Sequence, residues 1–150
     1  MSHVPTVSVI LPTYNRAPTL GRSIESVLGQ TFDDLELFVI DDGSEDSTCS
    51  LLDSYGKHPQ VRIFRNNHAG CSAARNCCLV HATGRHIAFQ DSDDEWLPNK
   101  LAIAVETLER ADSETAVFYS PMIEVCESGE QMTHHPPEEI IPGKLIIQRV

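Results

Sequence analysis

Basic residues are scarce in this 150-residue chain, which carries 11 Lys and Arg against 22 Asp and Glu and has a formal net charge of -11. Such a chain repels polyanions, so we expect no nucleic acid among its main partners. No apolar run approaches the roughly 18 residues that a membrane-spanning helix needs. The amino terminus also lacks a basic stretch followed by a short apolar core, which argues against a secretory signal peptide.

Glycine is absent where a phosphate-binding loop would need it. The turn after the first apolar run is Pro12-Thr13-Tyr14-Asn15-Arg16, and neither a Gly-x-Gly-x-x-Gly nor a Gly-Lys-[Ser/Thr] loop follows that run. Such glycines let backbone amides approach a phosphate closely, so a phosphate held by amides alone is disfavoured at this turn. A heterocyclic base that stacks on Tyr14 is the better prediction.

Paired cysteines are missing as well. The five cysteines are odd in number, two of them are adjacent, and no Cys-x-x-Cys pair occurs. A disulfide framework or a zinc knuckle is therefore disfavoured, and reduced thiols that fill apolar gaps are expected. Reduced thiols indicate a cytoplasmic protein or one at the cytosolic face of a membrane. Peripheral membrane association and a homo-oligomer are both compatible with that setting.

Short apolar runs alternate with helical patterns along the chain, and the 41% apolar content suits one domain with a substantial core. We expect strands at 6–11, 35–40, 61–64, 87–89 and 116–120, with residues 122–125 as a continuation of the last. Helices fit the segments between them. This alternation predicts an α/β fold with a mainly parallel sheet and helices on both faces. The tail from Glu127 is expected to be a loop or a frayed end.

Polar residues follow each of the first four predicted strands. Ligands of open parallel sheets bind beyond the carboxyl ends of the strands, so these residues should gather in one crevice. They are Thr13, Tyr14 and Asn15 after the first strand, Asp41 and Asp42 after the second, residues 66–70 after the third and residues 91–94 after the fourth.

The fourth of these segments is strongly acidic, with four acids among the five residues from Asp91 to Glu95. In an extended backbone Asp91 and Asp93 share a face, so both can offer carboxylate oxygens to a hard cation such as Mg²⁺ or Mn²⁺. The alternative is an acidic helix start, because acids also gather ahead of a first turn and Pro98 lies where a helix can begin. The motif alone does not decide between the two.

The second segment can recognise a base. A carboxylate from Asp41 or Asp42 can accept the imide N–H of uracil, a donor that cytosine lacks. The alternative is a tight turn that caps the next helix through Ser44. Two consecutive acids exceed what capping needs, which favours a function for one of them. Arg75 can bind a phosphate or pair with a strand-end acid, and both options stay open. A surface imidazole is expected at His68.

Five sequence blocks in colinear order resemble the family 2 glycosyltransferases of the GT-A fold. They are Val7-Ser-Val-Ile-Leu-Pro-Thr-Tyr-Asn15, Ser26-Val-Leu-Gly-Gln-Thr-Phe32, Val39-Ile-Asp-Asp-Gly-Ser-Glu-Asp-Ser-Thr48, Gly70-Cys-Ser-Ala-Ala-Arg-Asn76, and Asp91-Ser-Asp-Asp94 with Trp96-Leu-Pro98. The resemblance implies a Rossmann-like fold of nucleotide-diphospho-sugar transferases. It also implies a nucleotide-diphosphate sugar as donor, most often a UDP-sugar, and a role in polysaccharide biosynthesis.

The resemblance carries over roles for the base end of the site. Tyr14 and its neighbours would hold the base and ribose, Asp42 would face the uracil imide, and Asp41 would support that wall. The implied nucleotide-binding residues are Pro12, Thr13, Tyr14, Asn15, Asp41, Asp42, Gly70, Arg75, Asp91 and Ser92.

The resemblance likewise implies a metal end. Asp93 would coordinate the Mg²⁺ or Mn²⁺ that bridges the diphosphate, with Asp91 as a second candidate ligand close to the ribose. Asp94 would line the sugar site and is the candidate catalytic carboxylate. In this family an acceptor hydroxyl attacks the anomeric carbon in line, with inversion, as the nucleoside diphosphate leaves. The acceptor would be a glycan, a lipid-linked sugar or another hydroxyl compound.

The chain departs from the family pattern in its length. Family members usually continue well beyond 150 residues, and their base and acceptor-binding elements lie downstream of the fifth strand. We therefore expect residues 1–126 to form a nucleotide-sugar-binding domain and residues 127–150 to begin the acceptor side, or a tail, of a truncated enzyme. A binding-only module without the catalytic base is the alternative. A receiver-like signalling domain would need a lysine after the fifth strand, and no Lys occurs between Lys100 and Lys144.

Overall fold

The computed structural model describes residues 3–111, 117–126 and 128–135 of the chain. Contacts group the chain into two compact units, one up to Val105 and one from Glu106. The first unit contains a parallel sheet, and the second contains a two-stranded hairpin. Among the helices of the described ranges, none combines the length and the apolar character that crossing a bilayer requires.

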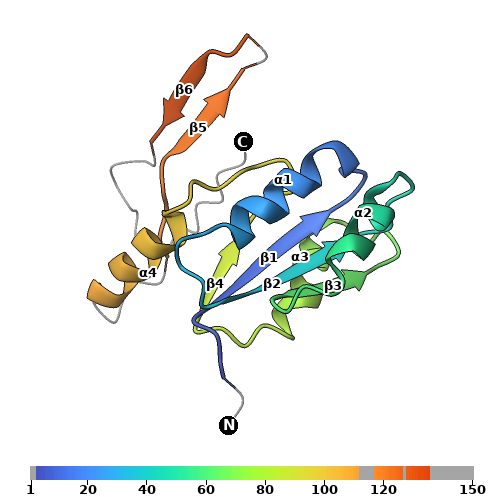
Figure 1. The fold of residues 1–150 in the computed structure, drawn as a ribbon, viewed down its shortest axis with the longest axis horizontal. Coiled ribbons are helices and arrows are strands. Elements are labelled where there is room, and N and C mark those ends of the chain that lie inside the picture. Colours follow the sequence, from blue (N-terminus) through green and yellow to red (C-terminus); the bar gives the residue numbers. More distant parts are fainter. Residues whose placement is uncertain (1–2, 112–116, 127, 136–150) are drawn as a thin grey trace. The chain divides into compact units, whose positions relative to one another are not determined.

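Four parallel strands form the sheet of the first unit (Figure 1). They are β1 Val7–Thr13, β2 Leu35–Asp41, β3 Val61–Arg65 and β4 His86–Phe89, in the spatial order β3-β2-β1-β4. The chain runs outward from β1 to β2 and β3, and then returns to the other side of β1 for β4. The strand order therefore reverses next to β1, which is where open parallel sheets bind their ligands.

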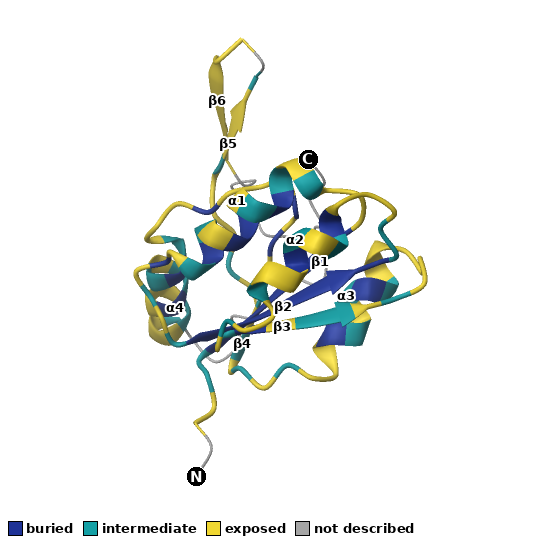
Figure 2. Ribbon diagram, turned by 45° about the vertical axis from the view of Figure 1, so that its right-hand side comes forward, coloured by how far each residue is buried: buried dark blue, intermediate teal, exposed yellow. Residues whose placement is uncertain are grey.

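Helices cover both faces of this sheet, as the sequence predicts (Figures 1 and 2). They are α1 Ala17–Leu28, α2 Thr48–Tyr55 and α3 Cys71–Leu79. A further helix, α4 Lys100–Arg110, adds Leu101 and Val105 to the core from its first turns. Alternate residues of a strand point to opposite faces, so β1 places Val9 and Leu11 in the core with α1 and α2, and Ile10 in the core with α3. Every residue of β1 and β2 is buried, as expected of central strands.

The sequence of α1 explains its place in the fold. Pro18 is tolerated in the first turn, because an N–H at that position would have no partner within the helix. Leu20, Ile24 and Val27 recur at i, i+4 and i+7 and are fully buried, so they form one apolar stripe against the sheet. The helix ends where the Gly29 N–H donates to the Glu25 carbonyl at 2.8 Å.

The second unit corrects two predictions. The sequence predicts a fifth strand at 116–120, but residues 117–120 have no regular secondary structure. The strand predicted at 122–125 is present as β5 Met122–Val125, and it pairs antiparallel with β6 Gln131–His134, which lies in the tail predicted to be a loop or frayed end. A side-chain contact of 2.8 Å between Glu124 Oε2 and His134 Nε2 joins these strands. The predicted domain boundary at residue 126 stays a prediction, because most of 127–150 lies outside the described residues.

Candidate functional site at the strand ends

The turns after β1 and β2 are joined by hydrogen bonds. Asn15 donates its backbone N–H to Ser44 Oγ at 2.8 Å and accepts the Glu45 N–H on its Oδ1 at 2.8 Å. Its φ of 51° lies in the left-handed region, which asparagine tolerates better than most residues. Ser44 therefore bridges two turns and does not cap the next helix, since α2 begins at Thr48 without a side-chain cap.

The turn after β3 is held by Asp42. Its two carboxylate oxygens accept the backbone N–H groups of Ala69 and Gly70 at 2.9 and 2.7 Å. The Asp42 side chain is only 5% exposed, so its carboxylate serves this turn first. Gly70 has a φ of 91°, a conformation that strongly favours glycine. The predicted contact between Asp42 and a uracil imide stays a prediction.

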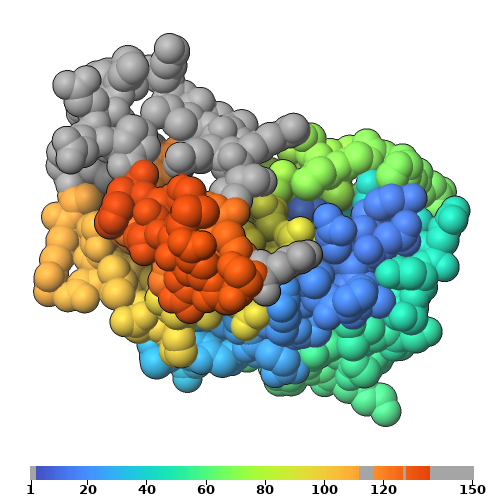
Figure 3. All heavy atoms as spheres, turned by 90° about the horizontal axis from the view of Figure 1, so that it is seen from above, coloured from blue at the N-terminus to red at the C-terminus, as the bar shows by residue number. Residues whose placement is uncertain are grey.

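An aromatic contact joins the turns after β1 and β3. The rings of Tyr14 and His68 lie with their centroids 4.3 Å apart. Figure 3 shows the blue, cyan and green segments of these turns and their helices side by side, in agreement with the contacts between them. Three of the four predicted polar strand ends thus form one surface.

Asp41 is fully buried and bound on both oxygens. Its Oδ1 accepts the Ser44 N–H at 3.0 Å, and its Oδ2 lies 3.0 Å from the Cys49 Sγ, which donates. This hydrogen bond raises the pKa of the Cys49 thiol, because the thiolate would lose the donor and face a carboxylate. Asp41 therefore fixes the turn behind Asp42, and its predicted support of a base-binding wall stays a prediction.

The acidic segment is a turn, and the prediction of an extended backbone there is wrong. The Asp94 N–H donates to the Asp91 carbonyl at 3.2 Å, and residues 92 and 93 form the turn between them. The alternative of an acidic helix start also fails, because α4 begins only at Lys100. The two predicted metal-binding carboxylates therefore share an exposed loop and not one face of a strand.

Arginines from the other turns reach this loop. Arg75 of α3 lies 2.6 Å from Asp91 Oδ1, and Arg16 of the β1 turn lies 3.4 Å from Asp93 Oδ2. The Asp91 and Asp93 side chains are 56% and 50% exposed. Of the two options for Arg75, the structure therefore shows the internal ion pair. These contacts bring the fourth strand end to the other three.

Asp94 differs from its neighbours in the turn. The surrounding protein removes part of its hydration, which raises the pKa of its carboxyl, and the nearby charges of Asp91 and Asp93 raise it further. Its carbonyl accepts two hydrogen bonds of 2.6 Å, from Ser23 Oγ and Gln90 Nε2. Both donors are buried, so the backbone at Asp94 is firmly placed.

A polar stripe that begins on α1 holds the backbone of the acidic segment and of the residues after it, and sequence reasoning did not identify it. It consists of Thr19, Ser23 and Ser26 of α1 and of Gln30, two residues beyond the end of that helix, which recur at i, i+4, i+7 and i+11. Their partners are the carbonyls of Ser92, Asp94 and Leu97 and the N–H groups of Trp96 and Leu101. The spacing of these polar residues could be seen in the sequence beside the apolar stripe. Their partners are backbone groups, which every residue has, so the sequence could not identify them.

The donor set suits a divalent cation. Asp91 and Asp93 offer carboxylate oxygens, the ligands that Mg²⁺ and Mn²⁺ prefer, and Mg²⁺ commonly binds one or two carboxylates together with substrate phosphates. Within the described residues no group of three or more His, Cys, Asp or Glu side chains is arranged to hold a metal ion. The residues therefore fit an ion that a phosphate ligand helps to coordinate.

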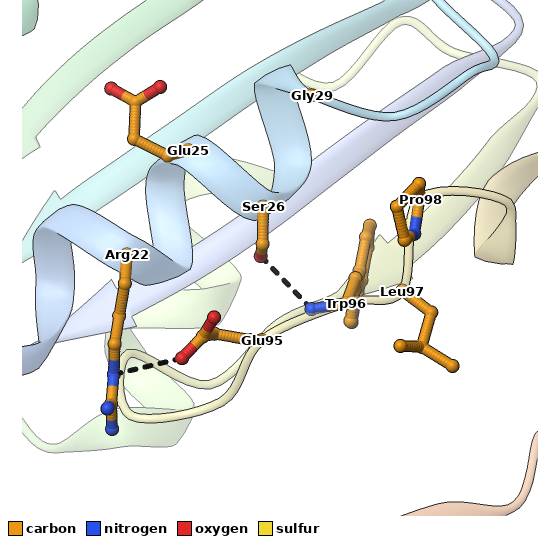
Figure 4. A pocket seen from close by; sticks show the side chains of 8 residues that line it. All are labelled: Arg22, Glu25, Ser26, Gly29, Glu95, Trp96, Leu97 and Pro98. Carbon is orange, nitrogen blue, oxygen red and sulfur yellow. Dashed lines mark hydrogen bonds and ion pairs between the residues drawn. The ribbon is translucent and has the colours of Figure 1, made fainter.

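Three of the remaining predicted residues are buried. Pro12 and Thr13 are the buried last residues of β1, and Ser92 is buried with its carbonyl accepting the Thr19 hydroxyl at 2.9 Å. A groove of about 490 Å³ lies between α1 and residues 95–98 (Figure 4). An ion pair of 3.3 Å between Arg22 and Glu95 lines it, and none of the predicted site residues does.

The sequence of the chain matches a known protein family and several of its members. The model of the family described as Glycosyl transferase family 2 matches residues 8–149. The chain is 42% identical over 103 residues to the UDP-Glc:alpha-D-GlcNAc-diphosphoundecaprenol beta-1,3-glucosyltransferase WfgD of Escherichia coli, covering 68% of this chain and 40% of that protein. It is 30% identical over 142 residues to an uncharacterized glycosyltransferase of Rickettsia felis, covering 93% and 23%. The chain thus spans less than half of the length of these relatives.

Solved structures share the fold of the first unit. The S. aureus TarS 1-349 complex with UDP-GlcNAc matches with a TM-score of 0.63 and 30% identity, over 69% of this chain and 31% of that chain. The mannosyltransferase PcManGT from Pyrobaculum calidifontis, in complex with GDP-Man and Mn²⁺, matches with a TM-score of 0.66 and 34% identity, over 75% and 34%.

Proposed function

The chain belongs to glycosyl transferase family 2, and we propose that its first unit binds a nucleotide-diphospho-sugar, with a UDP-sugar as the first candidate. The observation that carries this proposal is the meeting of the acidic turn with the turns after β1, β2 and β3. Arg16 lies two residues after Tyr14 in the chain and pairs with Asp93. Arg75 lies on the helix that follows the turn held by Asp42, and it pairs with Asp91.

The relatives support this class of donor. The TarS structure contains UDP-GlcNAc, the PcManGT structure contains GDP-Man with Mn²⁺, and the E. coli relative is named for UDP-Glc. Two of these three nucleotides are uridine nucleotides. A buried carboxylate at the base end also suits uracil, which carries an imide N–H donor.

We assign the diphosphate end to the acidic turn. Asp91 and Asp93 would hold Mg²⁺ or Mn²⁺ together with phosphate oxygens of the donor. Such an ion, when bound, supplies positive charge that stabilises a departing diphosphate. Until the donor arrives, Arg75 and Arg16 neutralise these two carboxylates. Asp94, whose backbone is fixed by Ser23, would face the sugar.

The reaction we propose is transfer with inversion. The oxygen of an acceptor hydroxyl bonds to the anomeric carbon while the bond from that carbon to the diphosphate oxygen breaks, and the electron pair leaves with the nucleoside diphosphate. A carboxylate takes the hydroxyl proton. The family resemblance puts that base downstream of the fifth strand, and Asp94, which would line the sugar site, is the catalytic candidate within the described residues. By analogy with the E. coli relative, a lipid-linked sugar at the cytosolic face of a membrane is the acceptor to test first, in polysaccharide biosynthesis.

A binding-only nucleotide-sugar module is the second candidate, because the contacts between the acidic turn and the other strand ends supply a donor site without requiring a base that acts on an acceptor. Incubation with UDP-glucose, UDP-GlcNAc and MnCl₂ separates the two candidates. Release of UDP, by transfer or by slow hydrolysis, supports the enzyme. Binding without any release supports the module.

Calorimetry with UDP, GDP, CDP and dTDP tests the donor site itself. We expect UDP to bind in the presence of MnCl₂ and to bind at least about tenfold more weakly without it, because the ion bridges diphosphate and carboxylate. The Asp91→Asn variant should lose this dependence. Asp53→Asn is the matched control, since Asp53 also pairs with an arginine at 2.6 Å and is exposed. Failure of all four nucleotides to bind with MnCl₂ would remove the proposed function.

A further inference from the structure

His68 and Tyr14 present the accessible surface at the base end of the site. Their ring centroids are 4.3 Å apart, with an angle of 39° between the planes. Tyr14 is 40% exposed and the His68 side chain 63%, whereas the Asp42 side chain is 5% exposed. A planar ligand that arrives at these strand ends therefore meets the two rings before it meets the carboxylate.

The loop holds His68 in this place at a conformational cost. Its φ of 45° lies in the left-handed region, where a residue other than glycine is uncommon. Gly43 packs so closely against His68 that a Cβ on Gly43 would lie 3.0 Å from the backbone nitrogen of His68. The His68 Nδ1 lies 3.3 Å from the Asp42 carbonyl. Such a conformation persists only where the surroundings determine it, and it is concentrated at functional sites.

We infer that His68 is a base-binding residue, and that His68 and Tyr14 together set how strongly the nucleobase of the donor binds. This inference rests on the proposed function, because it needs a nucleotide at the strand ends. Aromatic rings bind a base by stacking, which every base can offer through its π-face. Asp42 then acts on the base chiefly through the turn that carries His68.

Stacking makes a prediction that separates the base from the phosphates. UDP carries a base and pyrophosphate does not, while both carry the diphosphate that the acidic turn would bind. Loss of one aromatic contact should weaken UDP about three- to tenfold. Pyrophosphate should be unaffected.

The experiment titrates the 150-residue chain and its variants with UDP and with pyrophosphate, both in MnCl₂. His68→Asn removes the ring but keeps a residue that tolerates the left-handed backbone. We expect the Kd for UDP to rise about three- to tenfold and the Kd for pyrophosphate to stay within about twofold. His68→Phe keeps a ring and should bind UDP nearly as the unsubstituted chain does, with thermal unfolding used to confirm its fold.

His81→Asn is the matched control. His81 also stacks on an aromatic ring, that of Phe64, with centroids 4.9 Å apart and planes at 21°, but it follows α3 at the other end of that helix from the 66–70 turn. Its loss should leave both affinities unchanged. The pair of histidines therefore compares two stacking contacts that differ in their place in the fold.

Three results would overturn the inference. In the His68→Asn chain, unchanged UDP affinity or an equal loss of UDP and pyrophosphate would show that the ring does not bind the base. In the His68→Phe chain, a loss of UDP affinity as large as that of His68→Asn would exclude stacking. If the unsubstituted chain bound none of UDP, GDP, CDP and dTDP in MnCl₂, the proposed function would fall first, before any variant was compared.

Discussion

Two pairs of aspartates lie at the same end of one sheet, and the protein uses their carboxylates in different ways. Asp41 and Asp42 are 1% and 3% exposed, and their oxygens accept hydrogen bonds from backbone N–H groups and a thiol. Asp91 and Asp93 have side chains about half exposed, and each carboxylate pairs with one arginine. Identical side chains therefore serve as buried hydrogen-bond acceptors in one pair and as accessible carboxylates in the other.

This difference in burial shows how to separate a carboxylate's contribution to folding stability from its contribution to ligand binding. A buried carboxylate that accepts backbone N–H groups is part of the folded structure, so its removal should lower stability and binding together. An exposed carboxylate paired with an arginine contributes little to stability, so its removal should affect binding alone. The ratio of the two effects thus distinguishes the pairs.

Asp42→Ala should have the largest effect. Two hydrogen bonds to a charged group are lost, and the freed N–H groups of Ala69 and Gly70 can reach water, so we expect the free energy of unfolding to fall by about 2 kcal/mol. UDP should bind far more weakly, and pyrophosphate much less so. Urea unfolding and calorimetry measure these changes. Unchanged stability would mean that Asp42 does not hold the 66–70 turn, and equal losses of both ligands would remove it from the base end.

Asp93→Asn should have a large effect on binding and almost none on stability. The variant keeps the size of the side chain but loses the charge that attracts the cation, so metal-dependent UDP affinity should fall about tenfold or more. The free energy of unfolding should change by less than about 0.5 kcal/mol. Asp53→Asn serves again as the exposed control. A clear loss of stability would show that Asp93, like Asp41 and Asp42, is part of the folded structure, and the distinction between the two pairs would fail.

Arg16→Gln should have the smallest effect. The Arg16 guanidinium competes with a cation for Asp93 across a half-exposed contact of 3.4 Å, so its removal should raise the affinity for Mn²⁺ alone about twofold and leave stability within about 0.5 kcal/mol. Electron paramagnetic resonance of free Mn²⁺ measures this affinity. Arg65→Gln, which breaks a pair with Asp53, should leave it unchanged. A weaker affinity in Arg16→Gln would show that this arginine supports the site.

The sheet and the meeting of the strand ends could be predicted because they follow from patterns within single segments. Continuous apolar runs indicate central parallel strands, and β1 and β2 are buried along their whole length. The carboxyl-end rule then brings Tyr14, Asp42 and the acidic turn together without further information. The apolar stripe of α1 was readable for the same reason, because it repeats within one helix.

The rest depends on contacts between segments, which the sequence records poorly. Residues 91–94 form a turn because side chains of α1 and of Gln90 donate hydrogen bonds to their carbonyls. The local sequence propensity does not predict these hydrogen bonds. Residues 117–120 have strand-like composition, yet a strand forms only where a partner edge meets it, and the structure pairs β5 with β6. His68 resembled an ordinary surface imidazole, because its contact with Tyr14 joins residues 54 positions apart (68 minus 14).

The side chains of the polar stripe bind the acidic segment and the residues after it almost entirely through the main chain of those residues. Thr19, Ser23, Ser26 and Gln30 bond to carbonyls and amides, which every amino acid other than proline supplies in the same positions. The side chains at 93, 94 and 95 can therefore be exchanged without loosening the loop that presents them. Substitutions at these positions therefore probe the roles proposed for Asp93 and Asp94 while the backbone of the loop keeps its hydrogen bonds.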